Sequence, residues 1–364
     1  LIETNHMSFL NRRRRKLLWK ALKRMDASTL NLKYVRNRWK VLRTDRMATT
    51  TVPYPVNFML ELSCVCNLHC ITCPREYEYG KQMDCGFMPL DKALRIVDEV
   101  VPYLDSIGLT GLGETFLYPA DDMLELVRHI KRRKKSVIIT VSTNAHFKGF
   151  LEKIKPVLPY LDNIQFSVDG VGEVYERIRP GTDFEFIKRN IRETVSLAPD
   201  LEYMINCVVS DANYRDMPNI LHLAHELGIR SVNFNNMSIA SMPQRDHSYY
   251  EFFNSDVFRE AVEAMRDVAR RYPEMEVTGP DASGKSLGFR DCIFPWAYPY
   301  ITWNGYYVPC CGKPFPKLLN FGNVFDDGGV MNVLNSAKAQ AFRRLWQENR
   351  PPSFCHNCML APGV

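Results

Sequence analysis

The sequence predicts an α/β protein: a partial (β/α)6 TIM-like barrel followed by a small C-terminal module. Between residues 53 and 240, short apolar runs alternate six times with amphipathic stretches, which is the pattern of parallel strands joined by crossover helices. A polar or glycine-rich cluster follows each apolar run, as expected for loops at the carboxyl ends of barrel strands. Because six units are two short of a complete barrel, we expect an open barrel with a wide mouth.

The chain begins with a basic arm, residues 1–50. Residues 1–46 hold 14 Lys and Arg against 3 Asp and Glu, a net charge of +11, whereas the remaining 33 basic and 38 acidic residues give −5. Apolar side chains recur among these charges, as in one or two basic amphipathic helices. They are Leu17, Leu18, Trp19, Leu22, Met25, Trp39 and Leu42.

Three interpretations of the basic arm stay open. In the first, residues 8–46 would make peripheral contact with an anionic membrane surface or an acidic partner. In the second, the arm would pack on the main domain as a helical cap with a solvated basic face. Nucleic-acid binding is the least favoured, because no recognition-helix motif or aromatic-rich strand accompanies the charge.

Six strands and five helices are expected in order over the barrel, residues 53–240. The strands are residues 57–62, 106–110, 136–142, 163–168, 203–209 and 231–236. The helices lie near residues 90–104, 120–134, 147–157, 184–197 and 216–228. A helical connection, residues 241–287, leads to the C-terminal module, residues 288–364. From about residue 279 the sequence is rich in Gly, Pro and aromatic residues and has no helical periodicity.

Composition excludes several classes of protein. With 46% hydrophobic residues among 364, the chain is too apolar to be disordered, and no run of about 18 uncharged apolar residues could span a bilayer. The apolar stretch after the first basic run is too short for a signal peptide. We expect a cytoplasmic protein, or one held peripherally at the inner membrane surface by its basic arm. In that compartment the eleven cysteines would not form disulfides, and metal binding or catalysis is favoured.

Cys66, Cys70 and Cys73 form a C-x3-C-x2-C motif on the loop after the first strand. Three thiolates this close can bind one metal centre, and in a [4Fe–4S] cluster they leave one iron without a protein ligand, open to substrate or cofactor. The alternative is zinc with His69 as the fourth ligand. It is disfavoured because His69 adjoins Cys70, and adjacent residues that ligate one small ion strain the geometry.

This loop resembles the signature of the radical S-adenosylmethionine (SAM) enzymes, and the resemblance covers about residues 53–364. It implies that the open iron binds the amine and carboxylate of SAM. It also implies that the reduced cluster cleaves SAM to a 5′-deoxyadenosyl radical, which abstracts a hydrogen atom from a substrate C–H bond. Two positions depart from the family: Thr72 replaces an aromatic residue beside the adenine, and Ala145 replaces a glycine.

Two further loops resemble the SAM-binding segments of the family. Gly111, Gly113 and Glu114 are similar to its Gly-Gly-Glu motif, which implies that their backbone and carboxylate hold the SAM amine. A G-x-G-E turn alone is weak evidence, but this one follows the second strand. Ser142 and Asn144 resemble the segment that lies near the ribose.

The loops after the fourth and fifth strands extend the resemblance. Ser167 and Arg179 are similar to the pair that contacts the SAM carboxylate, which suits the bidentate geometry of a guanidinium. Arg177 is the weaker alternative to Arg179. Val209 would contact the adenine through its backbone.

Cys292, Cys310, Cys355 and Cys358 form a second group, with Gly305 five positions before Cys310. The spacing resembles the auxiliary-cluster module of the SPASM and Twitch enzymes. Because the sequence ends six residues after Cys358, we expect the truncated Twitch form. The resemblance implies four ligands to one further [4Fe–4S] cluster, with a zinc ribbon as the alternative.

Four cysteines remain. Cys311 follows a predicted ligand, and as a catalytic residue its thiol would return a hydrogen atom to a substrate radical; the alternative is that it only packs. Cys207 lies in the fifth strand, and Cys64 and Cys85 are expected to be inert.

The predicted function is that of a radical SAM oxidoreductase with SAM and two [4Fe–4S] clusters as cofactors. The second cysteine group most resembles that of 2-deoxy-scyllo-inosamine (aminocyclitol) dehydrogenases of antibiotic biosynthesis, which implies oxidation of a secondary alcohol on a sugar or aminocyclitol. A flavodoxin or ferredoxin would supply electrons. The alternatives are epimerisation of a sugar carbon with Cys311 as the hydrogen-atom donor, peptide modification, and a zinc-stabilised binding protein without enzymatic activity.

Overall fold

The computed structural model describes residues 17, 19–20, 22–24, 32–242, 244–281 and 288–361. Two apolar residues of the predicted basic helices, Leu18 and Met25, lie outside these ranges. No helix among the described residues is long and apolar enough to cross a membrane.

The described strands form one sheet in the order β7-β6-β5-β4-β3-β2-β1-β8-β9. Each neighbouring pair is parallel except β8 and β9, which are antiparallel. The strands are β1 (Asn57–Leu60), β2 (Ser106–Leu109), β3 (Ile138–Thr143), β4 (Asn163–Ser167), β5 (Glu202–Val209), β6 (Ser231–Asn236), β7 (Glu276–Thr278), β8 (Tyr300–Ile301) and β9 (Tyr307–Val308).

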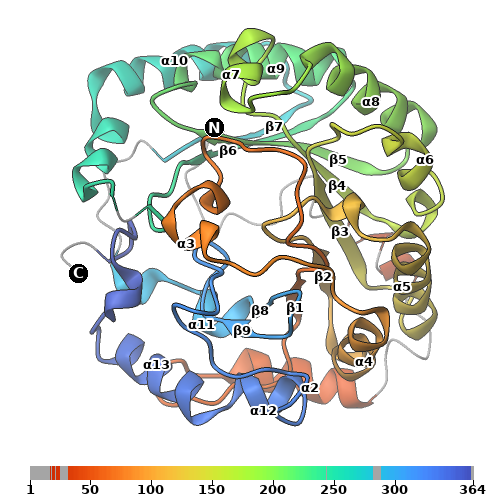
Figure 1. Ribbon diagram of the computed structural model, residues 1–364, viewed down its shortest axis with the longest axis vertical. Helices are drawn as coiled ribbons and strands as arrows, with labels where there is room; N and C mark the ends of the chain where they lie inside the picture. Colours follow the sequence, from red (N-terminus) through yellow and green to blue (C-terminus); the bar gives the residue numbers. More distant parts are fainter. Residues whose placement is uncertain are drawn as a thin grey trace.

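Helices α4, α5, α6, α8, α9 and α10 follow one another round the outside of the strands (Figure 1). The helices are α2 (Leu32–Arg43), α3 (Glu78–Lys81), α4 (Leu90–Val100), α5 (Ala120–Arg133), α6 (Phe150–Ile154), α7 (Glu173–Ile178), α8 (Phe184–Leu197), α9 (Met217–Glu226), α10 (Asp256–Ala269), α11 (Phe294–Ala297), α12 (Val330–Leu334) and α13 (Ala337–Gln347). The arrangement is a parallel barrel that stays open, and the predicted fold class is confirmed.

Local sequence explains the longer helices. In α5, the apolar residues at helical spacing are buried and the opposite face is exposed, which is the pattern of a helix packed on a sheet. Acidic residues occupy its first turn and basic residues its last turn, as the helix dipole favours. Asp183 caps α8 and Ser255 caps α10, each by accepting a backbone N–H of the first turn.

Two elements of the barrel are missing from the sequence-based prediction. Strand β7 has three residues, none of them buried, and therefore carries no apolar run by which it could be found. Helix α7 has six residues directly after the Asp169–Gly170 turn, where the sequence indicates only a loop. The six predicted strands match the observed ones to within two residues at each end.

The C-terminal module extends the barrel sheet. Strand β8 pairs with β1 through Met59 opposite Tyr300 and Leu60 opposite Ile301, and the module (blue) lies beside β1 in Figure 1. The segment after α2 is tied to the module as well, because the Asn335 side chain exchanges hydrogen bonds of 2.8 and 3.0 Å with the backbone of Val52. The module is thus bonded to the barrel at its first strand.

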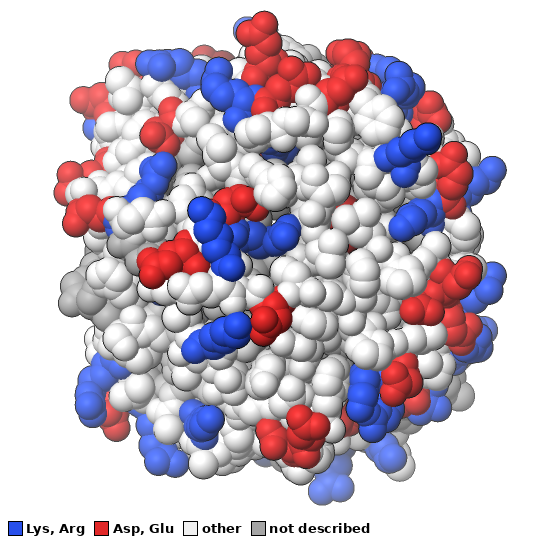
Figure 2. Space-filling model, viewed as in Figure 1, with Lys and Arg blue, Asp and Glu red and all other residues white. Residues whose placement is uncertain are grey.

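Charges on the face shown in Figure 2 are intermingled: lysines and arginines alternate with acidic residues, and no large area has a single sign. The described part of the basic arm packs elsewhere, against the residues that precede β2, β4 and β5. Tyr34 donates to Asp105, Arg24 pairs with Asp162, and Lys20 lies 3.9 Å from Glu202. Because these acids precede or begin strands, the arm lies at the amino ends of the strands, opposite the barrel mouth.

Candidate active site

The three cysteines of the first motif lie on one loop after β1. Cys70 is buried, and burial, together with the neighbouring Cys70 and Cys66, raises the pKa of Cys73 to about 12. The backbone fixes the loop, since Cys73 N donates to Cys70 O at 3.0 Å and Ile71 N donates to Ile178 O at 3.0 Å. The three thiols therefore share one small, largely desolvated space.

The G-x-G-E loop after β2 packs directly on the cysteine loop. Gly113 N donates to Ser63 O at 3.2 Å, and a Cβ at Gly113 would overlap the carbonyls of Ser63 and Val65. A Cβ at Gly111 would overlap the side chain of Glu61. Both glycines are required by the close approach of the two loops, whatever ligand they bind.

Glu114 is fully buried and connects the second loop to the third. Its carboxylate accepts the Thr143 hydroxyl at 2.6 Å, Asn144 N at 2.7 Å and Phe116 N at 3.1 Å. Burial raises its pKa, and these donors oppose that rise. The Asn144 amide continues the connection by donating to Asn67 Oδ1 at 3.1 Å, on the cysteine loop. Thr143 does not figure among the predicted site residues, although it is the residue between Ser142 and Asn144.

Three further predicted residues lie at the carboxyl ends of their strands. Ser142 Oγ is 3.3 Å from Gln165 Oε1, and Ser167 ends β4 with a partly exposed side chain. Val209 is buried, and its carbonyl accepts Met237 N at 2.8 Å. All three therefore face the same end of the barrel as the cysteine loop.

The structure distinguishes the two candidate arginines. Arg179 is buried and donates from Nε at 3.0 Å and from a terminal nitrogen at 2.6 Å to Asp169, which also accepts Val208 N at 2.8 Å. Arg177 is exposed and donates to Ala212 O at 3.1 Å. Burial raises the pKa of Cys70 in the first motif, and the positive charge of Arg179 opposes that rise.

The second group of cysteines is gathered from three distant segments. Burial raises the pKa of Cys292 to about 12, and the charges of the other cysteines add to the rise. Lys313 Nζ joins two of the segments by donating to Phe354 O at 2.7 Å and His356 O at 3.1 Å. The Trp346 indole fixes the third by donating to Cys292 O at 2.9 Å. The four members are Cys292, Cys310, Cys355 and Cys358.

Cys311 lies against the second group. Its thiol donates a hydrogen bond to Cys310, which lowers the pKa of Cys310 to about 7 and raises that of Cys311. Cys311 also lies near Tyr300 on β8. Cys207 is buried in β5, and burial raises its pKa.

The expectation that no cysteines pair is wrong at one place, because Cys64 and Cys85 form a disulfide. The backbone brings them together: Cys64 N donates to Gly86 O at 3.1 Å, and Ser63 and Phe87 form an antiparallel bridge. This local pairing puts the two Cα atoms 5.1 Å apart, within the usual range for a disulfide.

Glu61, which the sequence analysis does not single out, joins the barrel to the module. It is fully buried and accepts Leu112 N at 2.8 Å, the Tyr300 hydroxyl at 3.0 Å and Trp303 N at 3.1 Å. Burial raises its pKa, and the three donors oppose that rise. One carboxylate thus fixes the G-x-G-E loop relative to the β8–β9 hairpin.

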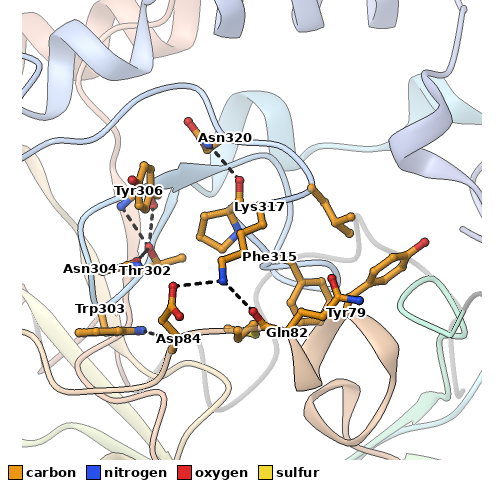
Figure 3. Close-up of a pocket in the computed structure, with 13 residues that line it drawn as sticks. Tyr79, Gln82, Asp84, Thr302, Trp303, Asn304, Tyr306, Phe315, Lys317 and Asn320 are labelled. Carbon is orange, nitrogen blue, oxygen red and sulfur yellow. Dashed lines mark hydrogen bonds and ion pairs between the residues drawn. The ribbon is translucent and has the colours of Figure 1, made fainter.

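A cavity of about 230 Å³ lies between the segment around α3 and the module (Figure 3). Lys317 crosses it to Asp84, 3.3 Å away, and to the carbonyl of Gln82 at 2.9 Å. The cavity wall combines aromatic rings with amides and this ion pair. The aromatic residues are Tyr79, Trp303, Tyr306 and Phe315.

The donor chemistry of both groups fits iron–sulfur clusters. The seven thiols are clustered in sets of three and four, and each set consists of the soft sulfur ligands that such clusters take. His69, the alternative zinc ligand, is exposed and lies 3.1 Å from Glu76. Among the described residues, no three or more His, Cys, Asp or Glu side chains are arranged as ligands of a single metal ion.

Comparison with protein families agrees with this geometry. The profile of the radical SAM superfamily matches residues 60–224, and that of SPASM, an iron–sulfur cluster-binding domain, matches residues 292–359. The chain carries a radical SAM domain. The SPASM domain follows it, and the cofactors of the pair are SAM and two iron–sulfur clusters, as expected. The zinc interpretations of the two cysteine groups are not supported, and the truncated Twitch form stays a prediction.

Solved structures share the fold of the radical SAM and SPASM domains. SuiB of Streptococcus suis bound to S-adenosylmethionine has a TM-score of 0.61 at 16% identity, covering 80% of this chain and 68% of that one. The anSMEcpe enzyme with AdoMet and the Cp18Cys peptide gives 0.62 at 18%, covering 85% and 88%. BtrN with AdoMet and 2-DOIA gives 0.50 at 12%, covering 84% and 94%. At these identities the likeness shows the fold alone.

The chain spans 66% to 69% of the length of the SuiB structures it matches. Among curated proteins, none matches its sequence significantly.

Proposed function

We propose that this radical SAM enzyme oxidises a secondary alcohol on a small, polar, ring-shaped substrate of the carbohydrate or aminocyclitol class. One observation carries the proposal: the second cysteine group is held against loops of the barrel mouth. Ser241 Oγ donates to Gly312 O at 2.7 Å, and the Tyr250 hydroxyl donates to Asn357 O at 2.8 Å. Since Ser241 and Tyr250 follow β6, a one-electron acceptor in the module would face the mouth.

The two cysteine groups would have different roles in this proposal. Cys66, Cys70 and Cys73 would hold the first cluster with one iron open to SAM. Cys292, Cys310, Cys355 and Cys358 would saturate the second cluster. A saturated cluster suits electron acceptance better than substrate binding, because no iron is left for the substrate to ligate.

When bound, SAM and the two clusters supply hydrogen-atom abstraction from an unactivated C–H bond together with a one-electron acceptor. The protein supplies position and exclusion of water. Glu114 holds the second and third loops in register, and Arg179, fixed by Asp169, presents a guanidinium beside the first motif, where the carboxylate of SAM would bind. Glu61 keeps the G-x-G-E loop at a constant distance from the module. Electrons would come from a flavodoxin or ferredoxin.

The cavity of Figure 3 supports a small polar substrate. It is smaller than about 300 Å³, the lower end of common ligand sites, and its aromatic walls with a few polar groups match the lining of such sites. Asp84 and the ring of Trp303 would receive an amino group of the substrate. The cavity also adjoins the second cysteine group, since Lys313 lies over the ring of Tyr79 at 5.9 Å.

The decisive experiment starts from protein reconstituted anaerobically with iron and sulfide. We expect about eight irons per chain and release of 5′-deoxyadenosine upon reduction with SAM. Cys70→Ala should abolish SAM cleavage. Cys355→Ala should lose about half of the iron and keep SAM cleavage but lose ketone formation. Cys207→Ala, a buried cysteine outside both groups, is the matched control and should behave as wild type.

Assays with sugars and aminocyclitols in deuterated solvent separate the remaining alternatives. A ketone with no solvent deuterium on carbon supports the oxidation. An epimerised product that carries solvent deuterium would show that the enzyme is an epimerase and not an alcohol oxidase. In that case Cys311→Ala should no longer form the product. Turnover of peptides but of no sugar would replace it by peptide modification.

A further inference from the structure

Helix α2 packs on the barrel with its polar side. Asn37 is its buried residue, and its amide exchanges hydrogen bonds of 2.9 and 3.1 Å with the backbone of Tyr54. Tyr34 donates to Asp105 at 2.8 Å, and Arg38 lies 3.1 Å from the same carboxylate. The contacts that hold α2 on the body are therefore hydrogen bonds and an ion pair.

The apolar side of α2 points into solvent. Leu32, Val35, Trp39 and Leu42 are 87%, 50%, 54% and 77% exposed. At 100° per residue, their spacings of three, four and three residues place them within one narrow face. A helix on a globular protein normally turns such a face toward the core, so the orientation of α2 is the reverse of the usual one.

The segment that precedes α2 repeats this reversal. Its described residues Trp19 and Leu22 are 58% and 57% exposed. Two basic residues of the same segment face inward, since Lys20 bonds to the carbonyl of Asp200 and Arg24 to the carboxylate of Asp162, whereas Lys23 is exposed and lies over the Trp19 ring. Leu17 of this segment is buried, but Trp19 and Leu22, like the apolar residues of α2, are left outside while polar groups bind the barrel.

Exposed cations border the apolar face. Lys33, Arg36, Lys40 and Arg43 of α2 are exposed, and the Arg43 guanidinium lies 3.8 Å from the centre of the Trp39 ring. No acidic residue occurs in α2. Apolar and aromatic side chains flanked by Lys and Arg are what a helix presents when it lies in the interface of a membrane that contains anionic lipid.

We propose that this outward face, formed by α2 together with Trp19 and Leu22, docks on an anionic phospholipid surface. The apolar stripe would enter the boundary between headgroups and acyl chains, and the flanking cations would bind the headgroups. Because the arm lies at the amino ends of the strands, the barrel mouth would point away from the lipid, and SAM and substrate would reach it from water.

Sedimentation with vesicles tests the proposal on the full chain. Wild type should bind vesicles that mix phosphatidylcholine with phosphatidylglycerol, and binding should weaken sharply as salt rises from about 0.05 to about 0.5 M. The double variant Trp39→Glu and Leu42→Glu should bind at least tenfold more weakly. Arg36→Gln should lose roughly fivefold, the effect of one cation near such a surface.

Val257→Glu is the matched control, because Val257 is 46% exposed at the start of α10, on the connection that follows β6 at the barrel mouth. It should bind vesicles as wild type does. All variants should cleave SAM normally, which shows that they fold and keeps this test separate from that of the catalytic proposal. Equal binding to pure phosphatidylcholine, or undiminished binding of the double variant, would contradict the proposal. A wild-type dimer that the double variant converts to a monomer would assign the face to a second copy instead.

Discussion

The two ends of the barrel bury carboxylates in different ways. At the mouth, Glu61 and Glu114 bond to backbone N–H groups and hydroxyls, all of them uncharged donors. At the opposite end, the buried Asp162 and the partly exposed Asp105 bond chiefly to Lys, Arg and Tyr side chains from the arm and from α5. Asp169 at the mouth also has a charged partner, Arg179, but that arginine belongs to the barrel itself, whereas Arg24 and Arg38 at the opposite end come from the arm.

This difference corresponds to two structural roles. Backbone donors come from the loops themselves, so an acid that accepts them fixes the relative positions of loops that would touch SAM. Long basic side chains reach farther and attach a separate segment to a finished barrel. We therefore expect substitutions at the mouth to change catalysis, and substitutions at the other end to change stability and the attachment of the arm.

Asp162→Asn should have the largest effect, on stability. Asp162 is buried and bonds to Arg24, to Lys131 at 2.6 Å and to Ile139 N at 2.9 Å. Removing its charge leaves the largely buried Lys131 without an opposite charge, although Lys131 still donates to Val137 O, and the loss costs about 3–5 kcal/mol for pairs of this kind. Chemical denaturation should show the loss, whereas SAM cleavage per folded molecule should stay near wild type.

Asp98→Asn is the control for Asp162→Asn. Asp98 also pairs with a cation of α5, Arg133 at 2.9 Å, but both side chains are nearly half exposed. Such surface pairs contribute about 0.2–1 kcal/mol. Equal destabilisation by the two variants would show that the buried ion pairs do not hold the amino end of the barrel together.

Glu61→Gln should show the contrasting behaviour of the mouth. Leu112 N and the Tyr300 hydroxyl donate to one carboxylate oxygen and Trp303 N to the other, so a glutamine would turn its NH2 group toward the donor or donors on one side. We expect about 1–3 kcal/mol of lost stability, a higher KM for SAM because Leu112 lies in the G-x-G-E loop, and roughly tenfold slower SAM cleavage.

Tyr300→Phe removes one of these three donors and leaves the carboxylate with the other two, so its effect on the KM for SAM should be smaller. If Glu61→Gln destabilised the protein without changing that KM, Glu61 would be structural only. The contrast between the two ends of the barrel would then fail.

The sequence was most informative where the chemistry is local. The C-x3-C-x2-C motif lies within eight residues and the G-x-G-E turn within four, so spacing alone describes them. Glu61 and Tyr300 are 239 residues apart, and no local pattern links a buried glutamate to a distant tyrosine. The orientation of α2 could not be predicted for the same reason. Periodicity shows that a helix has an apolar and a polar face, but not which of the two packs on the barrel.

Backbone conformation adds a second limit on what the sequence reveals. Ala145, which replaces a glycine of the family, has a φ of 54°, in the left-handed region where an L-residue costs roughly 1–2 kcal/mol. The Asn190 amide holds this turn by donating to Ala145 O at 2.8 Å. A substitution that looks like a departure from the motif therefore keeps its turn, through a contact 45 residues away.

Lys134→Met should give the smallest effect, and a pH dependence that separates the charged end of the barrel from the mouth. Lys134 is buried, donates to Leu104 O at 2.8 Å and lies 3.8 Å from the centre of the Tyr34 ring. Burial lowers its pKa to about 8 from an ordinary value of 10.5, although Asp105 opposes the change. Between about pH 8 and pH 10.5 the unfolded chain binds more protons at this lysine than the folded chain does. The free energy of unfolding of the wild type therefore rises with pH in this range.

Since methionine does not titrate, the stability of Lys134→Met relative to wild type should fall by about 1–2 kcal/mol from pH 7 to pH 10. Unfolding free energies of both proteins at the two pH values measure it. Lys135→Met, at the exposed neighbouring lysine, is the control for the loss of one positive charge. If the two variants showed the same pH dependence, the burial of Lys134 beneath α2 would have no energetic consequence.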